Sequence, residues 1–84
     1  DGKTPLFGAC RRNGDEIAKY LIELGADINK PDHNGQTPLF DACKFGNEPL
    51  VQYLVEHGVD VNKEDNAGNT PLYYAVELKK KKLI

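Results

Sequence analysis

The sequence repeats itself every 33 residues, and this period constrains the fold more than any other feature. The first copy opens with TPLF at residues 4–7, which returns as TPLF at 37–40 and as TPLY at 70–73. When residues 1–33 are aligned on residues 34–66, 15 positions are identical. A period of roughly 20–50 residues is typical of chains in which each unit buries its apolar surface against the next. We therefore expect one domain made of three units: 1–33, 34–66 and the half-unit 67–84.

Each unit is predicted to begin with a short helix. Thr4 is a suitable N-cap residue, and Pro5 is tolerated at the first helical position because no amide hydrogen is needed there. Leu6, Ala9 and Cys10 then follow at helical spacing, which places them on one apolar face. In the second unit the same face is repeated 33 residues later.

A second helix is predicted to follow in the first two units, starting near Asp15 in the first, where negative charge suits the helix dipole. Gly25 and Gly58 are expected to end these helices. In the third unit Lys79 occupies the position of the turn between helices, so we expect one helix to run on through residues 77–82. The apolar stripe expected to pack the second helices between units consists of Ile17, Tyr20, Leu21 and Leu24, and of Leu50, Val51, Tyr53 and Leu54.

Composition supports a packed core and a reducing compartment. The chain is 39% hydrophobic with a net charge of −2, which does not favour a general binder of polyanions. No apolar run approaches the roughly 18 residues that a membrane span needs. Cys10 and Cys43 stand one unit apart, and helices stacked about 8–10 Å apart are too distant for a disulfide. We expect two buried free thiols and an intracellular protein, cytoplasmic or nuclear.

The sequence shows no catalytic constellation. It contains no Ser, which excludes Ser-His-Asp hydrolysis, and both Cys fall on the buried face, away from solvent. His33 and His57 are too far apart in the sequence to indicate a metal site. We therefore expect no enzyme activity, no cofactor, no metal and no small-molecule substrate. Acidic residues that repeat with the unit are interpreted as builders of loop hydrogen bonds; these are Asp27, Asp60, Asp32 and Asp65.

Four consecutive lysines, at residues 79–82, admit two interpretations. Residues 67–84 carry four Lys and one Glu, a net charge of +3, whereas residues 34–66 carry two Lys and six acids, a net charge of −4. The run is either a basic patch for an anionic partner or a solvated helix end that complements the dipole. We favour the second interpretation. Because no aromatic residue interleaves with the lysines, nucleic acid is not an expected partner.

These motifs together resemble the ankyrin repeat family. TPL opens the first helix, LGAD at 24–27 or HGVD at 57–60 closes the second, and G-x-TP leads into the next unit. The resemblance implies an all-α solenoid of stacked antiparallel helix pairs with β-hairpin or loop fingers, as part of a longer array. The family usually has His after TPL, and its side chain ties the loop to the helix start. Phe7, Phe40 and Tyr73 stand there instead, so we expect apolar burial in place of that tie.

In proteins similar to this one, the fingers and the first helices line a concave groove that binds other proteins. Candidate contact residues are those that vary between units: Lys3, Arg11, Arg12, His33, Asn34, Gln36, Lys44, Phe45, Asn66, Asn69, Glu77 and Leu78. Arg12, Phe45 and Leu78 occupy equivalent positions and are expected to be neighbours along the groove. Aromatic and Arg residues are frequent hot spots. Alternatively, Phe45 folds onto the turn between its two helices.

The resemblance implies a non-catalytic module that binds a partner protein. Two alternatives are a structural spacer or self-assembling array that associates end to end, and an accessory module of a larger enzyme or channel. Asn29 and Asn62 follow a pattern, L-x5-D-hydrophobic-N, that resembles the asparagine hydroxylation site of many ankyrin repeats. We favour the simpler interpretation that these two side chains satisfy loop amides.

Overall fold

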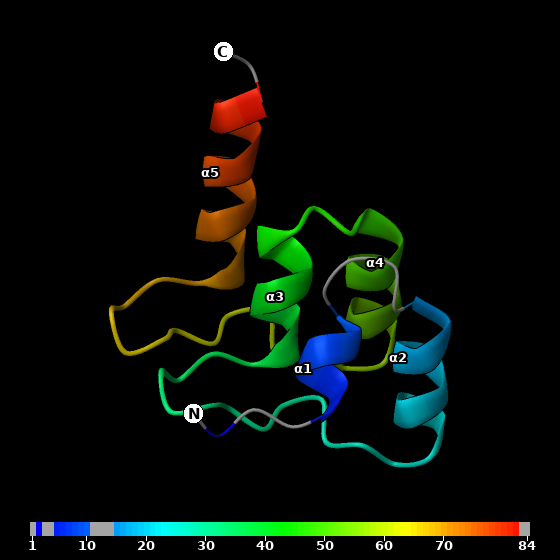
Figure 1. The fold of residues 1–84 in the computed structure, drawn as a ribbon. Coiled ribbons are helices and arrows are strands. Elements are labelled where there is room, and N and C mark those ends of the chain that lie inside the picture. The colour runs from blue at the N-terminus through cyan, green and yellow to red at the C-terminus, as the bar shows by residue number, and fades with distance from the viewer. Residues whose placement is uncertain (1, 3–4, 11–14, 83–84) are drawn as a thin grey trace.

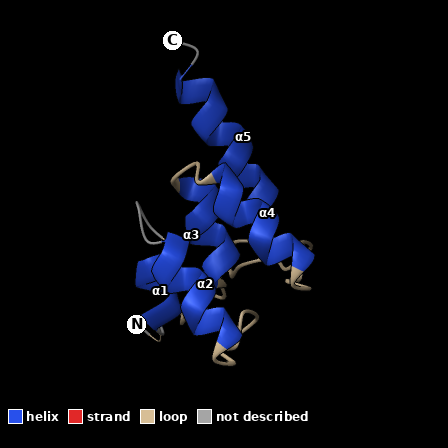
Figure 2. Ribbon diagram, turned by 90° about the vertical axis from the view of Figure 1, so that its right-hand side faces the viewer, coloured by secondary structure: helices blue, strands red, loops and turns tan. Residues whose placement is uncertain are grey.

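Two rows of helices make up the computed structural model, which describes residues 2, 5–10 and 15–82. The first row consists of α1 (Pro5–Ala9), α3 (Pro38–Lys44) and α5 (Pro71–Lys82), and the second of α2 (Asp15–Glu23) and α4 (Glu48–Glu56). α3 lies between α1 and α5, and α2 and α4 pack on α1 and α3 respectively (Figures 1 and 2). The part of the chain that is described contains no strand. The expected all-α stack of helix pairs is therefore confirmed, with fingers formed by turns, and α5 runs on to Lys82 as expected.

One apolar core runs through the stack. Leu6 from α1 and Leu39 from α3 are 1% and 2% exposed and belong to the same cluster. Leu50 and Leu54 from α4 are fully buried, and Ala75 of α5 packs against the edge of the cluster. Each unit thus supplies part of an interior that no single unit could close.

The predicted stripe of the first unit is only partly buried, so that expectation was wrong for three residues. Ile17, Tyr20 and Leu24 are 62%, 62% and 67% exposed. Leu50, one period after Ile17, is fully buried because α4 lies between α3 on one side and α2 on another, whereas among the described residues no helix covers the corresponding side of α2. Whether this stripe is buried therefore depends on whether a helix of a neighbouring unit packs against it.

The expected replacement of His by apolar burial is confirmed in the first two units. Phe7 and Phe40 are 1% and 0% exposed, whereas Tyr73 of the third unit is 46% exposed. The Thr37 hydroxyl is buried at the N-cap of α3 without a hydrogen-bond partner in the described part of the chain. The Phe40 side chain has no polar atom that could accept a hydrogen bond from it. Thr4, the equivalent N-cap of the first unit, lies outside the described residues.

Thr37→Val should leave the protein equally stable or stabilise it by about 1 kcal/mol, because a buried hydroxyl without a partner costs roughly 1–3 kcal/mol. Valine keeps the shape of the side chain and removes the unpaired group. Urea denaturation of both proteins measures the difference. A loss of more than about 1 kcal/mol, the usual cost of removing a helix cap, would contradict this description of Thr37.

Candidate functional site

The fingers are built around repeated aspartates. The Asp32 carboxylate accepts hydrogen bonds from the backbone N–H groups of Asn34 at 2.8 Å and Gln36 at 3.0 Å. Asp65 accepts the same pair of bonds from the residues two and four positions further on, at 3.0 and 2.9 Å. The interpretation of these acids as builders of loop hydrogen bonds is confirmed, and the bonds hold each finger in one shape.

Adjacent fingers are also bonded to each other. The backbone N–H of Asn66 donates to the Asn34 carbonyl at 2.9 Å, and its side-chain amide donates to the His33 carbonyl at 3.0 Å. Gly35 makes this approach possible: its φ is +77°, and a Cβ there would lie 2.6 Å from the Asn66 side-chain oxygen. The fingertips therefore present their exposed side chains from a connected surface.

A second line of loop bonds involves the asparagines of the hydroxylation motif. The backbone N–H of Asn29 donates to the Asp27 carboxylate at 2.9 Å, and Asn62 makes the equivalent bond to Asp60 at 3.0 Å. The Asn29 side-chain oxygen accepts from the backbone N–H of Asp60 at 2.9 Å. For Asn29 the interpretation as a residue that satisfies a loop amide is confirmed. Hydroxylation of either asparagine stays the alternative that we do not favour, and a gain of one oxygen in the mass of the native protein would demonstrate it.

Gln36 lies inside the molecule and not on its surface with the other candidates. Its side chain is buried, donates to Asp65 at 2.9 Å and accepts from the Lys44 ammonium at 2.6 Å. The Tyr74 hydroxyl donates to the same Asp65 oxygen at 2.6 Å, and the ammonium lies 4.8 Å from the centre of the Tyr74 ring. This cluster ties the second finger to the third finger and to α5. Residues 8, 41 and 74 are Gly, Asp and Tyr, so the repeat pattern gave no signal for it.

Asp65 is the anionic centre of this cluster. Desolvation by burial raises the pKa of its carboxyl, but hydrogen bonds from Tyr74, the Asn69 backbone, Gln36 and the Ala67 backbone outweigh it and lower the pKa to about 2. The same contact raises the pKa of Tyr74, together with desolvation. At neutral pH the carboxylate is therefore held ionised by four donors.

Because the folded pKa of Asp65 lies below its unfolded value, its carboxylate stabilises the fold above about pH 4, and this contribution is lost as the pH falls towards 2. Asp65→Asn should lower the free energy of unfolding at pH 7 and flatten its decrease between pH 5 and 2. Urea denaturation at each pH measures this. Asp27→Asn is the matched control, since Asp27 is exposed and accepts one backbone bond. Equal pH profiles for wild type and Asp65→Asn would contradict the assignment.

The remaining candidate residues lie at different depths. Phe45, the C-cap residue of α3, is 52% exposed. Leu78 is half-buried and packs on the turn after α3, where a Cβ on Gly46 would lie 2.9 Å from its side chain. Glu77 forms a 3.4 Å ion pair with Lys80. Lys3, Arg11 and Arg12 lie outside the described residues, so the expected row of Arg12, Phe45 and Leu78 is described only in part.

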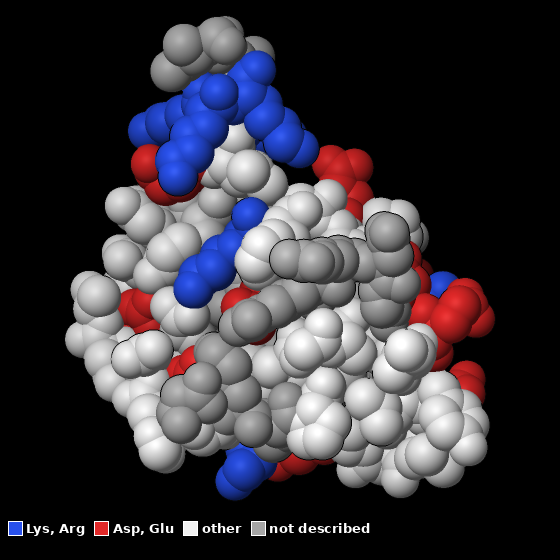
Figure 3. Space-filling view, viewed as in Figure 1, with Lys and Arg blue, Asp and Glu red and all other residues white. Residues whose placement is uncertain are grey.

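Charge is unevenly distributed over the surface. Lysines gather at the C-terminal end of α5, and acidic residues gather at the side formed by α2 and α4 (Figure 3). Lys79 to Lys82 form the last turn of α5, where they complement the helix dipole. This placement fits the interpretation of the lysine run as a solvated helix end.

The two cysteines are buried and free, as expected. Burial, with added repulsion from Asp41 and Asp15, raises the pKa of Cys10 to about 12, and burial raises the pKa of Cys43 to about 11. Both thiols are therefore protonated at neutral pH and are poor nucleophiles.

The described residues contain no cluster of three or more His, Cys, Asp or Glu residues arranged to hold a metal ion. In the same ranges, each helix is too short or too polar to cross a bilayer.

Comparison with known families decides which fold family these units represent. A family model described as ankyrin repeats (3 copies) matches residues 6–84. The chain belongs to the ankyrin repeat family. Ankyrin repeats are generally non-catalytic modules of protein–protein interaction. No curated protein matches the sequence.

Proposed function

We propose that this ankyrin repeat segment binds a partner protein on the face formed by its fingertips and first-row helices. The contact residues within the described ranges are His33, Asn34, Lys44, Phe45, Asn66, Asn69, Glu77 and Leu78. The exposed side chain of Phe45 is the observation that carries the proposal. A half-exposed aromatic residue at the end of a rigid helix offers a large contact area at little entropic cost.

The fingers support the same proposal. Their backbones are fixed by the Asp32 and Asp65 bonds and joined through Asn66, whereas His33 and Asn34 are exposed. A preorganised surface loses less entropy on binding than a flexible one, so a larger part of the contact energy remains as affinity. Gln36 is left out of the proposed surface because its side chain is buried and bonded within the molecule, whereas the other contact residues are partly or fully exposed.

Phe45→Ala should weaken partner binding at least about tenfold, as expected for a hot spot, with less than about 1 kcal/mol change in the free energy of unfolding. Partners are captured from a nuclease-treated cell lysate on four immobilised proteins: the wild-type chain, Phe45→Ala, His33→Ala and the control Val55→Ala. Val55 is 47% exposed but lies on α4 in the second row. A protein retained by the wild type and the control, and lost with Phe45→Ala, is then purified and its affinity measured by calorimetry.

Two outcomes would contradict the proposal. A loss of stability of more than about 3 kcal/mol in Phe45→Ala, typical of deleting a buried Phe, would place this residue in the core. Equal affinity of the purified partner for all four proteins would place the binding surface elsewhere.

A further inference from the structure

Each second-row helix, α2 and α4, has two apolar faces. Comparing the exposure of residues one period apart shows which face is covered by a neighbouring helix and which is not. Tyr53 of α4 is half-buried, and the Lys19 ammonium of α2 lies 5.4 Å from its ring centre, so this side of α4 faces α2. Tyr20, the equivalent residue of α2, is 62% exposed. We call Ile17, Tyr20 and Leu24 the α2 stripe. Leu24 directly follows the last residue of α2, and its backbone N–H donates to the Tyr20 carbonyl at 3.0 Å, so the spacing of three and four residues puts all three on one side of the helix.

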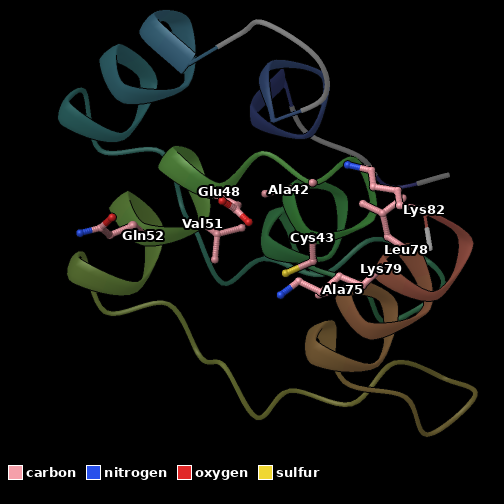
Figure 4. A pocket seen from close by; sticks show the side chains of 10 residues that line it. Ala42, Cys43, Glu48, Val51, Gln52, Ala75, Leu78, Lys79 and Lys82 are labelled. Atoms are coloured by element: carbon pink, nitrogen blue, oxygen red, sulfur yellow. The ribbon is translucent and has the colours of Figure 1, made fainter.

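On α4, at the other end of the stack, the opposite apolar face is the one left partly uncovered. Ala18 of α2 is fully buried, whereas Val51, one period later, is half-buried and lines a hollow of about 440 Å³ between α4 and α5. Figure 4 shows side chains from α3, α4 and α5 around it. We call this hollow the α4–α5 groove. Its apolar part consists of Ala42, Cys43, Val51, Ala75 and Leu78.

The stripe and the groove carry opposite charge. Glu16 and Glu23 are exposed and each immediately precedes a stripe residue, so both lie along the same edge of the stripe. Lys79 and Lys82 line the groove on the α5 side. Glu48 lines it on the α4 side, so a helix with an acidic edge fits with that edge towards α5. The groove thus selects both the charge and the direction of its occupant.

We infer that the α2 stripe of one copy docks into the α4–α5 groove of a second copy of this chain. Three apolar anchors spaced along one helix face and set against a groove are a common mode of helix recognition. The same side of a second helix is already covered within the chain, where α4 presents it to α2. Docking would bury the exposed α2 stripe of one copy in the groove of the next, and the groove shares only Leu78 with the proposed partner face.

Sedimentation equilibrium of the 84-residue chain tests this from about 1 µM to about 1 mM, a range that covers weak specific association. The mean mass should rise from 9.3 kDa at the lowest concentration to at least twice that value at the highest. We expect the association to be weak, because a single-helix contact falls at the small end of specific interfaces. Added salt should reduce the rise, since the charged edges are exposed. A constant mass of 9.3 kDa over this range would overturn the inference.

Charge reversal identifies the surfaces. The stripe variant Glu16→Lys/Glu23→Lys and the groove variant Lys79→Glu/Lys82→Glu should each be monomeric, and an equimolar mixture of the two should associate again. All four side chains are exposed, so circular dichroism should show unchanged folding. Glu56→Lys/Glu64→Lys changes the net charge as much as the stripe variant does and should associate like the wild type. Association of either reversed variant alone, or none in the mixture, would overturn the inference.

Discussion

The structure depends on apolar burial between units that are one period apart. α3 contacts helices of both neighbouring units, and the core runs from Leu6 through Leu39 to the edge formed by Ala75. A helix of five to nine residues is too short to be stable alone in water, so its packing partners supply its stability. Exposure at either end follows directly: among the described residues no helix covers Ile17 on α2, and Val51 of α4 lines a hollow.

Polar hydrogen bonds fix the loop conformations, which apolar burial alone does not determine. Burial sets the spacing of the units, and the aspartate-centred fingers set the register of the loops. Asp65 belongs to both systems, because its carboxylate holds its own loop and also receives the Gln36 and Tyr74 side chains from other elements. A charge-assisted cluster of this kind is directional, and it fixes the shape of the finger surface on which we propose that a partner binds.

Much of this arrangement was predictable because it is periodic. The 33-residue repeat predicted the helix pairs, the free thiols and the loop-building acids, and Lys79 in place of a turn residue predicted the long final helix. What broke the period was not predictable: a single sequence cannot show that the Tyr74 hydroxyl reaches Asp65, or that Gln36 turns inward. The exposure of Ile17 was also missed, because helical spacing identifies an apolar face but not whether a neighbour covers it.

Paired truncations at equivalent positions test the central claim that the core exists only between units. Leu50 and Ile17 stand one period apart on equivalent helices, but their exposed fractions are 0% and 62%. Leu50→Ala should lower the free energy of unfolding by about 2–5 kcal/mol, and Ile17→Ala by less than about 1 kcal/mol, as for an exposed position, both measured by urea denaturation of dilute protein. Equal losses at the two positions would show that each unit closes its own core, which the account excludes.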